Sequence, residues 1–301
     1  HYSWIKLPFL PLRAPTSLRQ FCLLTALTIG AASSSHAASQ STLMGSVSLM
    51  GEPVSGASVT LWEARGGQDP KILKTLSSSN NGNFQVSIKK KKGVVHYLVA
   101  KGGTIDGFSA EQLTMLTVLG KRERNNVVIN ELTTVGSVWP NAQLLEGTVL
   151  EGNQSALAIG SSQVENLVDQ STGRFGATLL KSTNLLNSET AARMNVLSDL
   201  IALCGQPQQS QACDQLLALT NSENTLSAMT SIARQPWKNA GALYQLFQSA
   251  YPINKASQLR TTATAPYLLF QPKSFALSLV FNGGGALGLG KLMFDGKGSM
   301  W

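Results

Sequence analysis

The chain has 301 residues, of which 43% are hydrophobic, and these values allow a sizeable core and suggest two domains. Charged residues make up only 13% of the sequence, about half the usual share, so we expect a surface wetted mainly by neutral polar groups. The formal net charge is +8. Four positive charges stand together at residues 89–92, whereas a nucleic-acid surface needs basic and aromatic side chains spread along one face. We therefore expect a solvated loop there and no nucleic-acid partner.

The first 37 residues have the pattern of a leader and secretory signal peptide. Arg19 precedes an apolar run of 12 residues, and Ser35 and Ala37 supply small residues for cleavage after Ala37. Twelve apolar residues are too few to span a bilayer, although a permanent signal anchor is the alternative. A lipid-modified cysteine would have to follow the apolar run, but Cys22 stands at its start. We therefore do not expect a lipoprotein. We expect an exported protein of net charge +5 with no membrane span after cleavage.

Short runs of alternating apolar and polar residues, separated by Gly, Pro and Asn, occupy the stretch from Gly45 to Gly103. This rhythm is typical of an antiparallel β-sandwich, because each run has one face to bury and one face to wet. The dipeptide Asn81-Gly82 predicts a tight hairpin turn. The residues expected to face the core are Val47, Leu49, Val59, Leu61, Phe84, Val86 and Ile88.

Within this stretch, the pattern of Gly45, residues 52–59, residues 81–84 and residues 97–100 resembles a carboxypeptidase regulatory-like domain. Such domains have a prealbumin-like β-sandwich fold and occur in many secreted bacterial proteins. The resemblance covers residues 43–103 and implies a scaffold without catalytic residues of its own.

Residues 104–250 are expected to form a mostly helical domain with a short strand near residues 127–131, because the apolar period changes from two to about 3.6. Thr133 or Thr134 is the expected N-cap of a helix that follows the strand. Further helices are expected from about residue 155 and from about residue 188. Five or six short helices would pack as a small bundle.

Cys204 and Cys213 are the only cysteines of the expected mature chain. In an exported protein, such an isolated pair between two helices favours a disulfide over free thiols. A metal site would need two more ligands, and the only remaining histidine, His96, lies in a predicted strand. We therefore expect a disulfide and no metal.

The sequence from Ala250 onward returns to extended structure. Prolines interrupt an expected linker at residues 251–273, and the alternation of residues 275–281 predicts a strand. Asp295 to Gly298 predicts a tight turn between the two arms of a hairpin.

Two patterns suggest a cofactor-binding or catalytic site, and neither stands in the sequence context that such a site needs. Gly283, Gly285 and Gly288 match the spacing of a dinucleotide-binding loop, but no helix opens at the last glycine. A Ser-His-acid triad would need His96, and no carboxylate pair stands out among 16 acidic residues. We expect no catalytic residues and no cofactor.

The C-terminal stretch resembles the start of an NHL-type or streptogramin-lyase-like β-propeller. The matching residues are Leu292, Phe294, Asp295, Gly298 and Trp301. Residues 274–301 would be the first strands of this propeller. Because a propeller needs several blades to close, the resemblance implies a C-terminally truncated fragment.

Together these patterns predict an α+β protein: an N-terminal antiparallel β-sandwich, then a small helical bundle, then a β-hairpin from an incomplete propeller. The resemblances imply a non-enzymatic exported or cell-surface interaction protein, whose partner is an unknown protein or carbohydrate ligand. The fragment would be a scaffold ahead of a ligand-binding propeller. The alternative is a lyase or hydrolase of the streptogramin-lyase-like type, with its active site on the missing propeller.

Overall fold

The computed structural model describes residues 40–281, with gaps at residue 90 and at residues 121–123, 255–258 and 261–262. By its internal contacts the chain divides into His1–Ala37 and Ala38–Trp301, and every described residue belongs to the second unit. The predicted leader and signal peptide, the glycine-rich pattern and the predicted hairpin therefore lie outside the described residues.

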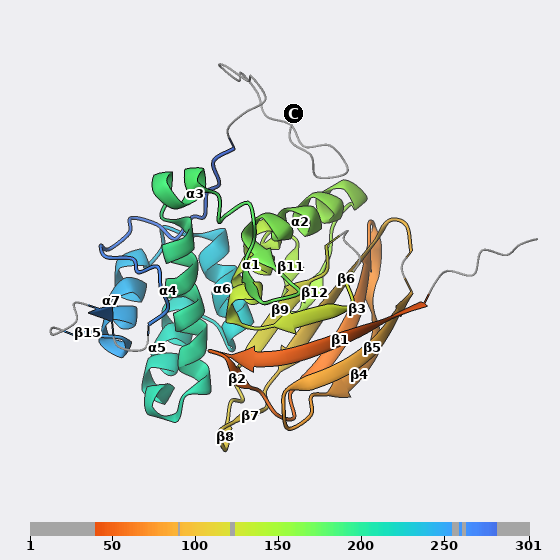
Figure 1. Ribbon diagram of the computed structural model, residues 1–301, viewed down its shortest axis with the longest axis horizontal. Coiled ribbons are helices and arrows are strands. Elements are labelled where there is room, and N and C mark those ends of the chain that lie inside the picture. The colour runs from red at the N-terminus through yellow and green to blue at the C-terminus, as the bar shows by residue number, and fades with distance from the viewer. Residues whose placement is uncertain (1–39, 90, 121–123, 255–258, 261–262, 282–301) are drawn as a thin grey trace, which may run out of the picture. The chain divides into compact units, whose positions relative to one another are not determined.

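The described residues form an α+β fold in which the strands of two four-stranded sheets precede the helices along the chain (Figure 1). β1 pairs antiparallel with β5 and β2 but parallel with β10, so one sheet is not purely antiparallel. The first sheet contains β1 (Gln40–Leu49), β2 (Glu52–Pro53), β5 (Asn83–Lys89) and β10 (Asn126–Ile129). The second sheet has the order β4 (Gln68–Ser77), β3 (Ser58–Arg65), β6 (Val94–Lys101) and β9 (Thr114–Val118), with all pairs antiparallel.

The buried sides of both sheets contribute to one apolar core, and the alternation in the sequence correctly identified these sides. In β5 every second residue is buried, as expected from the period of a strand. The seven residues predicted to face the core are all at most 5% exposed. Asn81-Gly82, however, does not form a hairpin. It connects β4 to β5, which belong to different sheets, because β5 pairs with β1.

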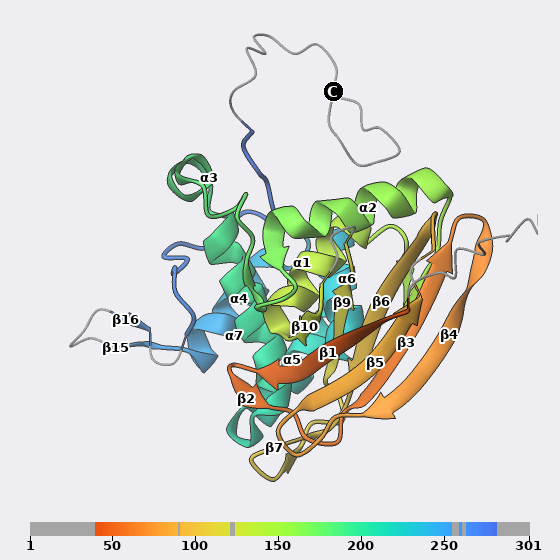
Figure 2. The same cartoon turned by 45° about the vertical axis from the view of Figure 1, so that its right-hand side comes forward.

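Seven α-helices occur in the described part of the chain, and Figure 2 shows them beside the sheets. They are α1 (Glu131–Asn141), α2 (Gln154–Leu167), α3 (Ser182–Asn187), α4 (Thr190–Ala202), α5 (Ser210–Thr220), α6 (Thr225–Arg234) and α7 (Ala240–Ala250). The 3-10 turns η1 (Leu203–Gly205) and η2 (Pro207–Gln209) join α4 to α5. Short two-residue pairs are β7 (Thr104–Ile105) with β8 (Phe108–Ser109), β11 (Leu145–Glu146) with β12 (Val149–Leu150), β13 (Val168–Asp169) with β14 (Arg174–Phe175), and β15 (Ile253–Asn254) with β16 (Leu259–Arg260).

The N-cap of α1 is Asn130, and the predicted caps Thr133 and Thr134 lie inside the helix. The Asn130 side chain accepts a hydrogen bond from the Thr133 N–H, and the Thr133 hydroxyl accepts one from the Asn130 N–H. The hydroxyl of Thr134 instead faces the sheet, where it accepts a hydrogen bond from the Leu116 N–H at 3.1 Å. Short polar residues can cap a helix or bond to a neighbouring backbone, and here the neighbour is a strand.

Hydroxyl groups on α1 and α6 cover the outer edge of β9, the last strand of the second sheet. The Val118 N–H donates to Ser137 at 3.0 Å. Thr225, the first residue of α6, accepts from the Thr114 N–H at 2.9 Å and donates to the Thr114 carbonyl at 2.7 Å. An unpaired sheet edge leaves backbone groups without hydrogen-bond partners. Here the hydroxyl groups of the helices supply the partners that a further strand would supply. β9 and β10 lie within the range assigned to the helical domain, so β pairing extends well past Gly103.

The expected disulfide is present between Cys204 in η1 and Cys213 in α5, and both residues are buried. It joins the end of α4 to the next helix across a short connection. We expect replacement of both cysteines by alanine to lower the free energy of unfolding by about 2.5 to 3 kcal/mol, because the unfolded chain loses a loop constraint. Urea unfolding curves would measure the change.

Reductant supplies the control for this double variant. It should shift the unfolding midpoint of the unmodified chain to that of the variant and leave the variant itself unchanged. Equal midpoints for the oxidised chain and the variant would contradict the prediction.

Candidate functional site

A cavity of about 510 Å³ lies where the two sheets meet the first turns of α2. Its size is within the range of small-molecule sites in proteins. Strands from both sheets contribute to it: the start of β1, the end of β5 and the start of β6. The apolar side chains that line it are Leu43, Ile88, Val94, Val95, Leu119 and Ala158.

Two glycines lie where α2 approaches the sheets, and at Gly66 the close neighbour is the backbone of α2. A Cβ atom on Gly66 would collide with the backbone of Gln154, and a Cβ atom on Gly120 would collide with the carboxylate of Glu165. The Gly66 N–H donates to Gln154 Oε1 at 3.2 Å, and Asn153 caps α2 by accepting from the Ala156 N–H. The start of α2 is thus fixed against the loop after β3.

Three basic side chains surround the carboxylate of Glu63, which is 9% exposed and lies beside the cavity. Its carboxylate lies 3.3 Å from Lys91 Nζ, 3.8 Å from His96 Nε2 and 3.9 Å from Arg65 Nη2. Glu63 and His96 are directly opposite each other on β3 and β6, so the sheet register brings them together. The next pair along the same strands, Trp62 and Tyr97, stacks its rings with centroids 5.9 Å apart.

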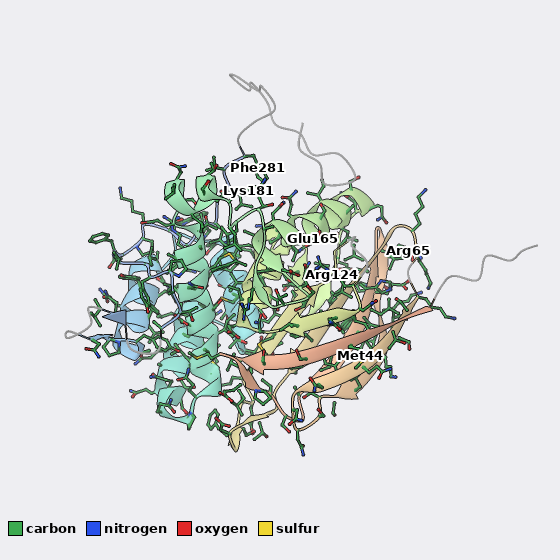
Figure 3. The ribbon with its side chains drawn as sticks, viewed as in Figure 1. Met44, Arg65, Arg124, Glu165, Lys181 and Phe281 are labelled. Atoms are coloured by element: carbon green, nitrogen blue, oxygen red, sulfur yellow. A yellow bond between two sulfur atoms is a disulfide. The ribbon has the colours of Figure 1, made fainter. Side chains whose placement is uncertain are left out.

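Arg124 links α2 to the chain that enters β10. Its guanidinium lies 3.1 Å from Glu165 and 3.1 Å from Asp169, and Figure 3 shows the Arg124 and Glu165 side chains together beneath α2. The side chain is only 11% exposed, and its Nε is buried without a hydrogen-bond partner among the described residues. The Arg124 guanidinium therefore holds α2 in place, while its Nε–H has no acceptor among the described residues.

The cavity can offer a ligand an apolar wall and one positive charge. The charge of Arg124 is balanced by Glu165 and Asp169, but the lining also includes Lys92, which is exposed and has no ion-pair partner among the residues described here. Two hydroxyls of the lining donate to backbone carbonyls: Ser41 to Ile88 and Ser161 to Ala158. This arrangement fits an amphipathic anion, a molecule with an apolar body and one negatively charged group.

Sequence reasoning did not identify the cavity or the grouping of Glu63 with His96. Lys91 and Lys92 belong to the basic run that was expected to be a solvated loop. They are exposed, but Lys91 pairs with Glu63 and both line the cavity. The predicted propeller residues Leu292, Phe294, Asp295, Gly298 and Trp301 lie outside the described residues.

A second polar cluster is buried between α1, α4 and the residue that follows α7. Glu131 Oε1 accepts from the Met50 N–H at 3.2 Å, while Oε2 is buried although the residue as a whole is partly exposed. Asp199 accepts hydrogen bonds from the N–H and the hydroxyl of Thr264. The Tyr251 hydroxyl donates to the backbone carbonyl of Asp199 at 3.1 Å.

Burial determines the charge state of this cluster. Burial, with a smaller contribution from repulsion by the nearby Asp199, raises the pKa of Glu131 to about 7. Burial likewise raises the pKa of Asp199 to about 6 against the opposing hydrogen bonds from Thr264. The pKa of the Tyr251 hydroxyl is also raised, first by burial and then by repulsion from Asp199.

Neither the models of known protein families nor the curated protein sequences match this chain. Within the part of the chain that the structure describes, no group of three or more His, Cys, Asp or Glu side chains is arranged to hold a metal ion. No helix in the same described ranges is long and apolar enough to cross a membrane.

The buried carboxylates predict that the protein becomes less stable as pH rises from about 4 to 7. In this window the folded chain retains protons on Glu131 and Asp199 that the unfolded chain has released, so each rise in pH favours unfolding. For Glu131 the free energy of unfolding falls by about 3 kcal/mol across this window, because a pKa difference of one between the folded and unfolded chain corresponds to about 1.4 kcal/mol. Urea unfolding at several pH values would measure it.

The variant Glu131→Gln keeps a carbonyl acceptor for the Met50 N–H and removes the titrating group. It should flatten the pH dependence of unfolding. The exposed Glu111→Gln serves as the matched control and should preserve the slope of the unmodified chain. A stability that rises with pH over this window in the unmodified chain would refute the assignment.

Proposed function

We propose that this protein is a non-enzymatic, exported binding protein and that the cavity beside α2 is its site for a small amphipathic anion. The observation that carries the proposal is the apolar cavity of about 510 Å³ with the exposed Lys92 in its lining. Transfer of an apolar body from water into the cavity is favourable, and the Lys92 ammonium would attract its anionic group.

The buried Cys204–Cys213 disulfide supports an extracytoplasmic location, because such bonds persist in oxidising compartments. We further propose that the two sheets are the sandwich of a carboxypeptidase regulatory-like domain. Their shared core and the placement of residues 52–59 and 81–84 at turns and strand starts support this proposal. The sandwich and helices would be a scaffold ahead of a ligand-binding propeller.

A pair of naphthalene dyes tests the site. Anilinonaphthalene sulfonate carries an anionic group, and N-phenyl-naphthylamine has the same apolar rings without the charge. We expect the full chain to bind the sulfonate about two- to fivefold more tightly, because the exposed Lys92 ammonium acts only on the charged dye. Fluorescence titration of both dyes would measure the ratio.

Two adjacent positions on α2 give a matched pair of variants. Ala158→Trp should fill the cavity and abolish binding of both dyes, whereas Ile159→Trp lies on the same helix outside the cavity lining and should leave binding unchanged. Lys92→Ala should weaken the sulfonate several-fold and leave the neutral dye unaffected. Equal affinity for the two dyes, or full binding by a folded Ala158→Trp variant, would exclude the proposed site.

A further inference from the structure

Residues 275–281 were expected to form a strand, and the structure shows that they lie against helices instead. No strand is assigned to them, and no backbone ladder holds them. Figures 1 and 2 show this blue segment passing along the end of α4 toward α3. We call residues 275–280 the strap.

Two helix side chains each hold both backbone groups of one strap residue. Thr190, the first residue of α4, accepts from the Ser278 N–H at 3.1 Å and donates to the Ser278 carbonyl at 2.5 Å. Asn184 in α3 accepts from the Val280 N–H at 2.6 Å and donates to the Val280 carbonyl at 3.2 Å. The two contacts are two residues apart, which is the repeat of an extended chain.

The same side of the strap is held at its other end. Arg193 Nη1 donates to the Ala276 carbonyl at 2.9 Å. The Phe275 carbonyl accepts from Trp139 Nε1 at 3.3 Å, and the Phe275 N–H donates to the Pro236 carbonyl at 2.8 Å. Side chains of α1, α3 and α4, together with the Pro236 carbonyl between α6 and α7, therefore hold the backbone of the strap at residues 275, 276, 278 and 280.

Alternate side chains of the strap enter the apolar core. Phe275 is 0% exposed, and Leu277 and Leu279 are partly buried against the core, whereas Ala276 and Ser278 are exposed. Main-chain hydrogen bonds combined with recesses for every second side chain are the features by which proteins recognise extended peptides.

With the strap in place, two of the polar helix residues that hold it, Asn184 and Thr190, are shielded from water and need protein partners. Asn184 is 0% exposed and Thr190 is 1% exposed. A buried donor or acceptor left without a partner costs about 1 to 3 kcal/mol. The backbone of the strap supplies these partners to Asn184 and Thr190 where it covers them.

We propose that α3 and α4 form a binding site for an extended peptide with apolar side chains at every second position, and that the strap is its intramolecular ligand. This site is independent of the cavity beside α2. A linked segment has an effective local concentration of order millimolar, so the strap excludes a competing peptide until it is released.

The double variant Leu277→Asp with Leu279→Asp should release the strap in the full chain without changing α3 or α4. A fluorescein-labelled peptide with the sequence of residues 273–281 should then bind this variant at least about tenfold more tightly than it binds the unmodified chain. A peptide carrying the same two aspartates is the matched control and should not bind. Adding Asn184→Leu to the released variant should weaken the unmodified peptide about tenfold.

Amide hydrogen exchange gives a second measurement that needs no peptide and no released variant. In the unmodified chain, the amides of Ser278 and Val280 should exchange at least about tenfold more slowly than those of Leu277 and Leu279. Thr190→Val should accelerate hydrogen exchange at the Ser278 amide and leave exchange of the β9 amides unchanged. Uniform exchange along the strap, or no peptide binding by a folded released variant, would overturn the proposal.

Discussion

The hydrogen bonding of the β9 edge is the interaction on which the arrangement of the described residues depends. Thr134, Ser137 and Thr225 are all 0% exposed and all bond to backbone groups of β9. Without them the outward N–H groups of Thr114, Leu116 and Val118 would be buried and unpaired, at a cost comparable to several lost hydrogen bonds. The helices therefore cannot separate from the sheet without exposing this edge, and sheet and helices share one core.

The same chemistry is used a second time at the strap. Thr225 and Thr190 are each the first residue of a helix, and each holds the N–H and the carbonyl of one residue of an extended segment. A threonine hydroxyl can do both because it carries one donor and two acceptor sites. Its position at the start of a helix leaves it free of the i−4 carbonyl that an interior threonine usually bonds. Helices in this protein thus take the place of a neighbouring strand at two sites.

This replacement of a neighbouring strand by helices explains which parts of the fold could be predicted from the sequence. The alternation of Phe84, Val86 and Ile88 identified the buried face of β5, because that pattern depends only on the period of a strand. The alternation of residues 275–281 predicted a strand, but a strand also needs a backbone partner. Periodicity contains no information about that partner. The one local signal was the presence of polar residues such as Thr190 and Asn195 among the inward positions of α4, whose side chains bond to residues 278 and 266.

The cavity could not be predicted from the sequence for a related reason. Its walls come from segments as distant as Leu43 and Ala158, and Gly66 allows the start of α2 to lie against the loop after β3. Arg124 then fixes α2 to the chain that enters β10, which pairs with β1. A molecule in the cavity would touch both sheets and α2 at once. Because a ligand that binds only the folded state stabilises all of the contacts that build its site, occupancy of the cavity would strengthen the docking of α2 on the sheets.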